Sequence, residues 1–460
     1  MPIDYSELLG HWRSIGYNRL LSFDTDHYRL YTVTDQQCSL YDEGTPEEFH
    51  QGYHRIQCSD KDNLSLYYAH DLTCYHYHRI NTFPDERPIY QCSNHDPVIN
   101  FEDFCQVFSE NYAFFDLHSN DWKGICDTFR AQVSSNTHND ELAEIFRQMI
   151  APLRDGHIYI AAGQEQIRSF SVNRGPRAAL EKLFQLPEPG ISLRSTVDTI
   201  SDKIENTVLA PFAATRSTLK TAGNKVLSWC ELEKGIGYLN VLRLFGFADT
   251  PEHRTANDLP HKPHDCGPFL QADMAALNSA LDIICQDMNN MDALIIDARI
   301  NGGGFDRAGL EIANRLSDRK QTAYYKKARQ GSQHTARQAI TTTSHCGPTF
   351  HKPVYLLISP FTLSAGEIFA LCLQALPHVQ LLGEPTCGIL SDNLFHKLPN
   401  GWEISLSNEV YESVDNICYE SIGVAPDVEL PRLGQNLLAD LQQGLIDAVE
   451  LIQEQTAISN

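Results

Sequence analysis

The sequence lacks any long apolar run, since no window of its 460 residues approaches 18 consecutive hydrophobic side chains. A transmembrane helix needs about 20 such residues, so we expect no membrane span. The first twenty residues also lack the basic stretch followed by an apolar run that is typical of a signal peptide. We therefore expect no signal peptide and a cytoplasmic location.

Basic residues are few, because 36 Lys and Arg stand against 59 Asp and Glu, a formal net charge of −23. A nucleic-acid partner requires a basic surface, so we expect none. A regular cysteine framework is absent as well. The 13 cysteines are scattered, and Cys285 and Cys372 lie in apolar patterns that are typical of buried thiols. This usage favours a reducing compartment over a disulfide-bonded protein.

Hydrophobic residues make up 42% of the chain, which is enough for two or three folded domains at this length. Residues 1–95 alternate and are rich in Tyr, Thr and His, which predicts an N-terminal β-rich domain, either a small barrel or a sandwich. Residues 96–165 have helical spacing and predict a helical cap segment. Residues 166–230 are polar with helical patches and predict a mostly helical insertion.

Strand and helix patterns alternate between residues 231 and 435. The stretches "DALIIDAR" and "PVYLLISP" predict buried strands, and Asn400–Gly401 predicts the turn of a hairpin. Such alternation predicts βαβ units and a largely parallel sheet. Residues 436–460 predict an amphipathic C-terminal helix. The expected fold class is thus α+β and multidomain, with an α/β core beside the cap segment and the N-terminal β-rich domain.

The stretch "SPFTLSAGEIFA" places Ser364 between an apolar strand and an apolar helix. Ligands bind beyond the carboxyl ends of parallel strands, and the free N–H groups at a helix start stabilise negative charge. Ser364 is therefore placed where a nucleophile would be useful. Its position alone favours a helix N-cap, and the two interpretations are compatible.

The stretch "NGGG", residues 301–304, also follows a buried strand, and its glycines let backbone amides approach a ligand closely. Amides of Gly302 or Gly303 with that of Ala365 could form an oxyanion hole. A phosphate-binding loop or a plain tight turn is the alternative. A serine nucleophile also needs a base, and His157 in "LRDGHIYI" is a candidate, although its pattern alone favours a turn histidine.

Six motifs occur in one order along the chain: "LRDGHIYI", "LIIDARINGGG", "SPFTLSAGEIFA", "GEPTCGIL", "LPNGWEISLS" and "YESIGVAPDVEL". Together they resemble the tail-specific and tricorn-type serine proteases of peptidase family S41, from about residue 99 to residue 432. The resemblance implies a crotonase-like (ClpP/crotonase) core and a serine peptidase acting on peptides or unfolded proteins. It implies no cofactor and no metal, and it leaves association into homo-oligomers open.

The resemblance also implies the catalytic residues. The processing-protease branch uses a lysine in a T-x-G-K stretch, but Ile389 holds that position here and Lys397 falls in the predicted hairpin, so a Ser/Lys dyad is excluded at that site. The tricorn-like branch uses Ser, His and Glu, which match Ser364, His157 and Glu420. Ser364 would attack the scissile carbonyl, His157 would take its proton, and Glu420 would orient the imidazole.

The sequence departs from the family at two further points, and one assignment has a competitor. Gly156 stands where tricorn has a second serine just before its histidine, so a further hydroxyl or a direct contact must link His157 to Glu420. Residues 165–225 lack the loop and strand pattern of a PDZ domain, which many relatives carry. Glu412 lies near the motif and competes with Glu420, which we favour because it holds the motif position.

Two other functions remain open at this point. A non-catalytic ligand-binding protein could use the same scaffold, and a crotonase-type enzyme acting on a thioester could use the same glycine loop. Cys74, His76 and His78 share one face of a predicted strand, and "HKPHDC" from His261 to Cys266 carries similar side chains. Both stretches could bind zinc, but no second ligand cluster follows, so we expect a strand face and a loop.

Overall fold

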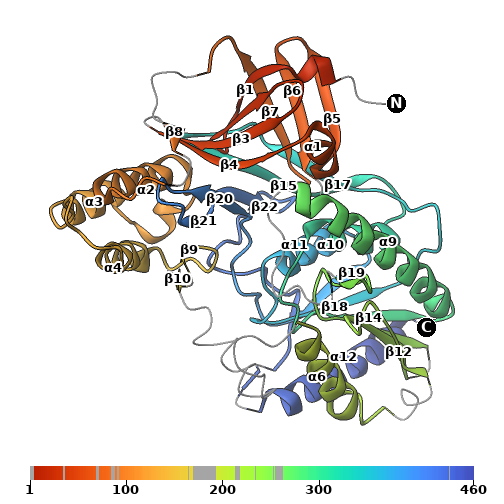
Figure 1. Cartoon of the computed structure of the whole chain (residues 1–460). Helices are drawn as coiled ribbons and strands as arrows, with labels where there is room; N and C mark the ends of the chain where they lie inside the picture. The colour runs from red at the N-terminus through yellow and green to blue at the C-terminus, as the bar shows by residue number, and fades with distance from the viewer. Residues whose placement is uncertain are drawn as a thin grey trace.

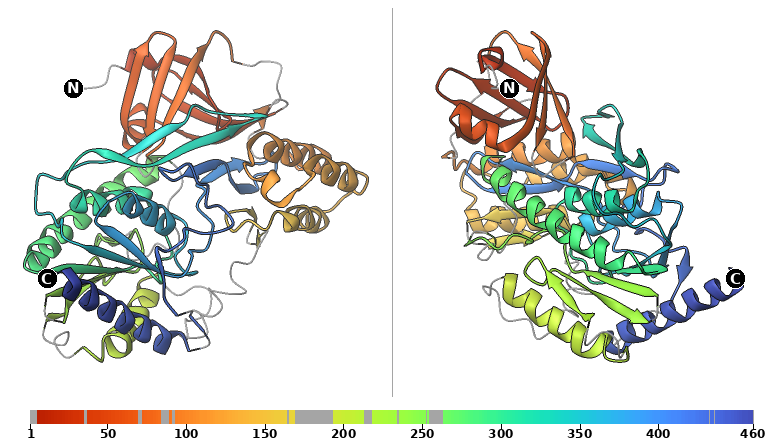
Figure 2. Two further views of the ribbon diagram at one scale, coloured as in Figure 1. Left: turned by 180° about the vertical axis from the view of Figure 1, so that it is seen from behind. Right: turned by 90° about the vertical axis from the view of Figure 1, so that its right-hand side faces the viewer.

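The structure is a computed structural model of the chain. The N-terminal strands lie at one end of the molecule and the C-terminal helix lies at the other (Figures 1 and 2). The residues that the structure describes are 5–34, 37–68, 72–83, 89–90, 93–163, 165–168, 193–212, 218–233, 235–251, 253, 263–431, 433–434 and 436–459. None of the helices in these ranges is long and apolar enough to cross a membrane.

The N-terminal part is an eight-stranded sheet with the order β5-β6-β7-β1-β2-β3-β4-β8. Its register follows the sequence alternation, because Leu64, Leu66 and Tyr68 point inward along one strand while their neighbours are partly exposed. The predicted β-rich domain is therefore present, whereas its closure as a barrel or a sandwich stays a prediction. Its elements are a 3₁₀ turn at Tyr5–Leu8, β1 Gly10–Ser14, β2 Arg19–Phe23, β3 Tyr28–Val33, β4 Cys38–Gly44, α1 Pro46–Gly52, β5 Tyr53–Asp60, β6 Asn63–Tyr68, β7 Cys74–Ile80 and β8 Ile89–Tyr90.

The helical segment projects from one side of the molecule (Figure 1). Asp96 and Asp121 cap two of its helices through hydrogen bonds to Val98 N and Gly124 N. The rings of Phe104 and Phe146 stack 3.9 Å apart between the helices. Its elements are α2 Pro97–Asn111, a 3₁₀ turn at Phe115–His118, α3 Trp122–Arg130, α4 Asn139–Ile150 and a 3₁₀ turn at Ala151–Leu153.

A four-stranded sheet with the order β10-β9-β21-β20 joins this helical segment to a distant part of the chain. The strands are β9 Tyr159–Ala162, β10 Glu165–Arg168, β20 Asn393–Lys397 and β21 Glu403–Ser407. The last two form the hairpin predicted at Asn400–Gly401, and Gly401 has a φ of +89°. This pairing of β9 with β21 holds the segment that follows His157 against the core.

The core is a seven-stranded sheet with the order β11-β12-β13-β14-β18-β19-β23. All pairs from β13 to β23 are parallel, while β11, β12 and β13 pair antiparallel. The largely parallel sheet is thus as predicted. The strands are β11 Lys220–Ala222, β12 Leu227–Glu233, β13 Ile236–Val241, β14 Ala293–Asp297, β18 Val354–Ile358, β19 Val379–Gly383 and β23 Val428–Glu429.

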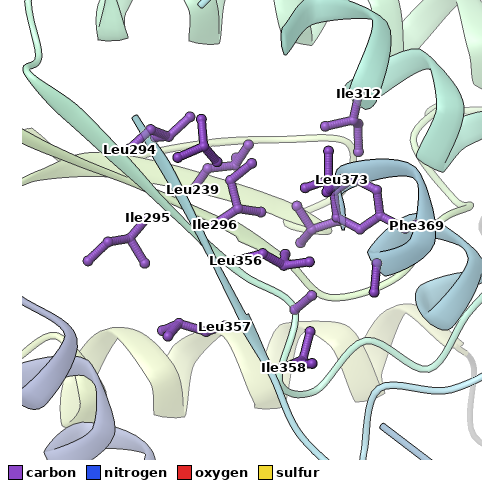
Figure 3. Close-up of a cluster of buried hydrophobic side chains, with 14 of the residues drawn as sticks. Leu239, Leu294, Ile295, Ile296, Ile312, Leu356, Leu357, Ile358, Phe369 and Leu373 are labelled. Atoms are coloured by element: carbon purple, nitrogen blue, oxygen red, sulfur yellow. The ribbon is translucent and has the colours of Figure 1, made fainter. Parts of the chain in front are cut away.

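Helices cover both faces of this sheet, with α9, α10 and α11 on one face and α6 and α12 on the other (Figure 1). Because both faces are covered, the central strands are buried at every position and mostly apolar, with Asn240 and Asp297 as the exceptions. Figure 3 shows Ile296 and Leu356 of the sheet meeting Ile312, Phe369 and Leu373 of the helices. The helices are α6 Leu193–Lys203 with a π turn at Ile204–Val208, α9 Pro263–Met288, α10 Asp306–Leu316, α11 Ala365–Gln374 and α12 Leu437–Ser459.

A further sheet lies between the core and the N-terminal strands (Figures 1 and 2). Its strands are β15 Gln321–Gln330, β16 Gln333–His334, β17 Gln338–Thr342 and β22 Glu409–Glu412. The domain boundaries stay a prediction, although the boundary at residue 230 falls inside β12, which pairs with β13. Of the predicted helical insertion, residues 169–192 lie outside the described residues, and α6 lies in the part that is described.

Candidate active site

Ser364 lies between β18 and α11, at the N-cap position of the helix. Its backbone has φ +52° and ψ −125°, a conformation that non-glycine residues rarely adopt and that costs about 1–3 kcal/mol. Two buried hydrogen bonds hold the turn in place: Thr362 Oγ1 donates to Ala298 O at 2.8 Å, and Leu363 N donates to Asn301 O at 2.9 Å. The strained serine is thus fixed to the loop that follows β14.

His157 reaches this serine from 207 residues away, since its Nε2 lies 3.2 Å from Ser364 Oγ. The histidine precedes β9, and two contacts fix its backbone. Its N–H donates to Asp155 Oδ1 at 2.8 Å, and its carbonyl accepts from Ser405 Oγ at 2.9 Å. The structure therefore brings together the predicted nucleophile and the predicted base, with a distance at which a proton can pass between them.

Glu420 is buried beside this pair, but its carboxylate does not hydrogen-bond the imidazole. Its Oε2 accepts from the backbone N–H groups of Leu390 and Ser391, both at 2.9 Å. Burial raises the pKa of Glu420 well above its usual value, and the negative charges of Asp155 and Glu367 raise that pKa further. The direct link from glutamate to histidine that the family pattern left open is thus not made in this structure.

The competing Glu412 lies elsewhere. Its carboxylate pairs with Lys327 Nζ at 2.7 Å and with Arg337 Nε at 2.9 Å, on β15 and beside it. A carboxylate held by two cations at the edge of a sheet has no access to the serine. Between the two glutamates, the structure therefore favours Glu420.

Sequence reasoning missed Asp155 and Tyr112, which lie next to the site. Tyr112 follows α2, is fully buried, and its hydroxyl donates to the Asp155 carboxylate. Burial raises the pKa of Tyr112, and the charges of Asp155 and Glu420 add to that rise. Asp155 could have been found as the first residue of "DGH", but nothing near Tyr112 in the sequence distinguishes it from a core aromatic residue.

The predicted oxyanion donors differ in their availability. Gly303 lies against the serine, because a Cβ on it would come within 2.9 Å of Ser364 Cβ. Its N–H, however, donates to Asn301 Oδ1 at 2.9 Å, and the Gly302 N–H donates to Leu242 O at 3.3 Å. Only the Ala365 N–H has no acceptor among the residues that the structure describes. The oxyanion hole therefore stays a prediction, in which the Gly303 N–H would have to exchange Asn301 Oδ1 for the substrate oxygen.

Glu367 organises the loop that carries Ile389, where the processing proteases have lysine. The fully buried carboxylate accepts from Thr386 Oγ1 and Gly388 N, both at 2.6 Å, and from Ile389 N at 2.8 Å. It also accepts from Ser364 N at 3.2 Å. Burial raises the pKa of Glu367 to about 7, although these donated hydrogen bonds act in the opposite direction. The helix that begins after the serine is thus tied to the loop from residue 386 to residue 389.

Replacing Glu367 with glutamine should flatten the pH dependence of stability. The unfolded chain releases this proton near pH 4.5 and the native protein near pH 7, so the native state binds the proton more tightly. The unfolding free energy of the wild type should therefore decrease as the pH is raised from 4.5 to about 7. The expected loss is about 3 kcal/mol, at about 1.4 kcal/mol per pH unit. Urea unfolding at several pH values would measure it, and parallel curves for wild type and Glu367→Gln would contradict the expectation.

The two stretches weighed as metal sites are described only in part. Among the described residues, no three His, Cys, Asp or Glu side chains gather as a metal site. Cys74 Sγ lies 3.8 Å from His76 Nδ1, which also contacts Ser65 Oγ at 3.0 Å, while His78 Nδ1 contacts Asn63 Oδ1 at 2.6 Å. His261 lies outside the described residues.

Known proteins resemble this chain in two segments. The family model of peptidase family S41 matches residues 269–430, and that of the tricorn protease C1 domain matches residues 98–151. A carboxyl-terminal-processing protease of Picosynechococcus sp. is 29% identical over 203 residues, which are 42% of this chain and 46% of that protein. One of Synechocystis sp. is 34% identical over 145 residues, which are 31% of this chain and 32% of that protein. The chain thus spans less than half the length of these relatives.

Solved structures share the fold at low sequence identity. A candidate peptidase from Parabacteroides merdae has a TM-score of 0.57 at 20% identity, covering 78% of this chain and 97% of that chain. Mature CPAF complexed with lactacystin has a TM-score of 0.50 at 12% identity, covering 80% of this chain and 99% of that chain. Both family models match segments that contribute to the site. Residues 98–151 include most of α2, and residues 269–430 include Ser364 and Glu420. The resemblance of this chain to peptidase family S41 and to the tricorn protease C1 domain thus lies in residues 269–430 and 98–151.

Proposed function

We propose that this chain is a serine peptidase that cleaves peptide bonds through an acyl-enzyme on Ser364. The observation that carries the proposal is the 3.2 Å contact between Ser364 Oγ and His157 Nε2 at the start of α11. In this mechanism His157 takes the hydroxyl proton while Oγ attacks the scissile carbonyl. The imidazolium then protonates the leaving amine, and a water molecule activated by His157 hydrolyses the ester.

Negative charge develops on the carbonyl oxygen during both steps. The free Ala365 N–H at the first turn of α11 is the donor best placed for it, and the helix start adds a favourable dipole. The second donor in this proposal is the Gly303 N–H, which must first leave Asn301 Oδ1. Removal of one oxyanion donor typically costs about 3 kcal/mol of transition-state stabilisation, so this exchange would matter for the rate.

Glu420 is the proposed carboxylate of the triad. It acts in the buried region that it shares with Asp155, whose negative charge raises the pKa of Glu420. Proton transfer to His157 places a positive charge nearby, and that charge favours the ionised form of Glu420. The carboxylates would in turn stabilise the imidazolium. The core around them would be of the crotonase-like type, with its active site at the carboxyl ends of β14 and β18.

The other two functions find no support in a particular contact. A pure carrier has no need of a histidine at hydrogen-bonding distance from a strained serine, and neither has a crotonase-type enzyme acting on a thioester. The substrate class that fits the relatives is a peptide or an unfolded protein. The names of the two cyanobacterial relatives point to cleavage near a carboxyl terminus, which for this chain is a proposal only.

Labelling with a fluorophosphonate tests the proposal directly. The wild type should gain one covalent adduct, located on Ser364 by peptide mass spectrometry. Ser364→Ala should gain none, because it lacks the oxygen that attacks phosphorus. Thermal unfolding of both proteins would check that the variant is folded. A wild type that stays unlabelled while it is folded, or an adduct that persists in Ser364→Ala, would contradict the proposal.

A further inference from the structure

The N-terminal sheet lies outside both segments that match the family models. One of its turns nevertheless packs against other parts of the chain. The turn between β1 and β2 has left-handed backbone at Gly16, Tyr17 and Asn18, with φ values of +73°, +60° and +48°. Gly16 has no room for a side chain, since a Cβ would come within 2.6 Å of Thr335 Cγ2. Asn18 hydrogen-bonds Glu110 of α2. The turn is therefore shaped to fit a surface formed by other parts of the protein.

At this junction the carboxylate of Glu409, the first residue of β22, is buried and receives four donors. Tyr17 OH and Thr73 Oγ1 donate to Oε1 at 2.6 and 2.9 Å. Lys326 Nζ and Tyr411 OH donate to Oε2 at 2.9 and 3.2 Å. One oxygen of this carboxylate thus takes its two side-chain donors from the N-terminal part, and the other takes them from the sheet formed by β15 and β22.

The backbone of the same glutamate continues toward the active site. Glu409 N donates to Ser391 Oγ at 3.2 Å, and Ser391 N donates to Glu420 Oε2 at 2.9 Å. Ser391 therefore connects the anchored glutamate to the proposed triad carboxylate through two consecutive hydrogen bonds. Its segment continues into the loop whose amides Gly388 N and Ile389 N bind Glu367, which in turn binds the backbone of the serine.

We propose that the N-terminal sheet is a positioning element of the active site, in which Tyr17 and Thr73 hold Glu409 and thereby the loop from residue 386 to residue 391. The inference rests on the proposed function for its catalytic consequence, but its structural part stands on the contacts alone. Tyr17 and Thr73 touch no reacting atom, so they are positioning residues. Buried polar networks of this kind keep a single geometry only while each member is satisfied.

Hydrogen exchange provides a test that does not depend on activity. In Tyr17→Phe/Thr73→Val, which removes both hydroxyls and little volume, amides of residues 386–391 should exchange about tenfold faster than in the wild type, as expected for looser local structure. Replacing Thr73 with serine instead of valine keeps a hydroxyl at this position, so part of the wild-type protection from exchange should be retained. Tyr28→Phe is the matched control, because it removes a buried hydroxyl that bonds Asp42 within the same sheet. Unchanged exchange in the double variant, or equal acceleration in Tyr28→Phe, would overturn the inference.

Labelling kinetics test the catalytic consequence. The double variant should label with a maximal rate constant, kinact, about tenfold to a hundredfold lower, because small displacements of catalytic groups cost that much. The half-saturating fluorophosphonate concentration, KI, should stay within about twofold of the wild-type value. A larger change in KI would instead indicate that the variant no longer binds the reagent normally. A double variant with the wild-type kinact would overturn the positioning role. An unlabelled wild type would instead contradict the peptidase proposal, and the exchange comparison would still decide the inference.

Discussion

Replacing His157 with alanine is expected to slow fluorophosphonate labelling and peptide hydrolysis about a thousandfold or more, as loss of the base does in serine hydrolases. The reason is the 3.2 Å contact between its Nε2 and Ser364 Oγ, which is the route by which the hydroxyl loses its proton. Without a base, the hydroxyl is a weak nucleophile at neutral pH. The loss should appear in kinact and in kcat, with KI little changed, because the histidine acts in the chemical step.

His351→Ala is the control, since it removes an exposed histidine that follows β17 and precedes β18. It should label at the wild-type rate. Thermal unfolding of both variants would show that neither loses its fold. Activity of His157→Ala within tenfold of the wild type would contradict its role as the base. In that case Asp155 would be the next residue to replace, because its carboxylate accepts a hydrogen bond from the backbone N–H of His157.

Much of the catalytic core could be predicted because its signals are local. The strands β14 and β18 are short runs that are apolar except for Asp297 at the end of β14, and glycines or a small polar turn follow each of them. Such runs predict buried parallel strands whose carboxyl ends meet at one edge. Ser364 and the loop of residues 301–304 were therefore expected together. His157 came from the family resemblance, because its own sequence pattern indicates only a turn.

Other features depend on contacts between distant residues, and no local pattern carries them. Glu367 appeared in the sequence as an ordinary residue of an apolar helix, but the fold buries it against the loop of residues 386–389. Asn301 looked like part of a glycine turn, yet its side chain occupies the Gly303 amide. Glu420 is a similar case, since the motif pattern pointed to a contact with the histidine while its carboxylate accepts hydrogen bonds from backbone amides. In each case burial and the identity of the partner follow from tertiary packing.

The same holds for Lys326 and Glu409, which lie 83 residues apart and form a buried ion pair at 2.9 Å. Each side chain is almost fully removed from water, so a change to one of them leaves the other charge buried without its partner. We expect Lys326→Met to lower the free energy of unfolding by about 3–5 kcal/mol, the usual cost of breaking a buried pair. Glu409→Gln should cost a similar amount for the same reason.

The double variant Lys326→Met/Glu409→Gln separates the charge effect from the loss of contacts. Because it removes both charges, its loss of stability should be smaller than the sum of the two single losses, by about 2 kcal/mol or more. The exposed pair of Lys123 and Asp127, 2.7 Å apart on α3, is the matched control. Lys123→Met should leave the stability close to that of the wild type, because exposed pairs contribute little. Urea unfolding of all four variants measures these losses, and additive losses would mean that the two buried charges do not depend on each other, which would contradict the expectation.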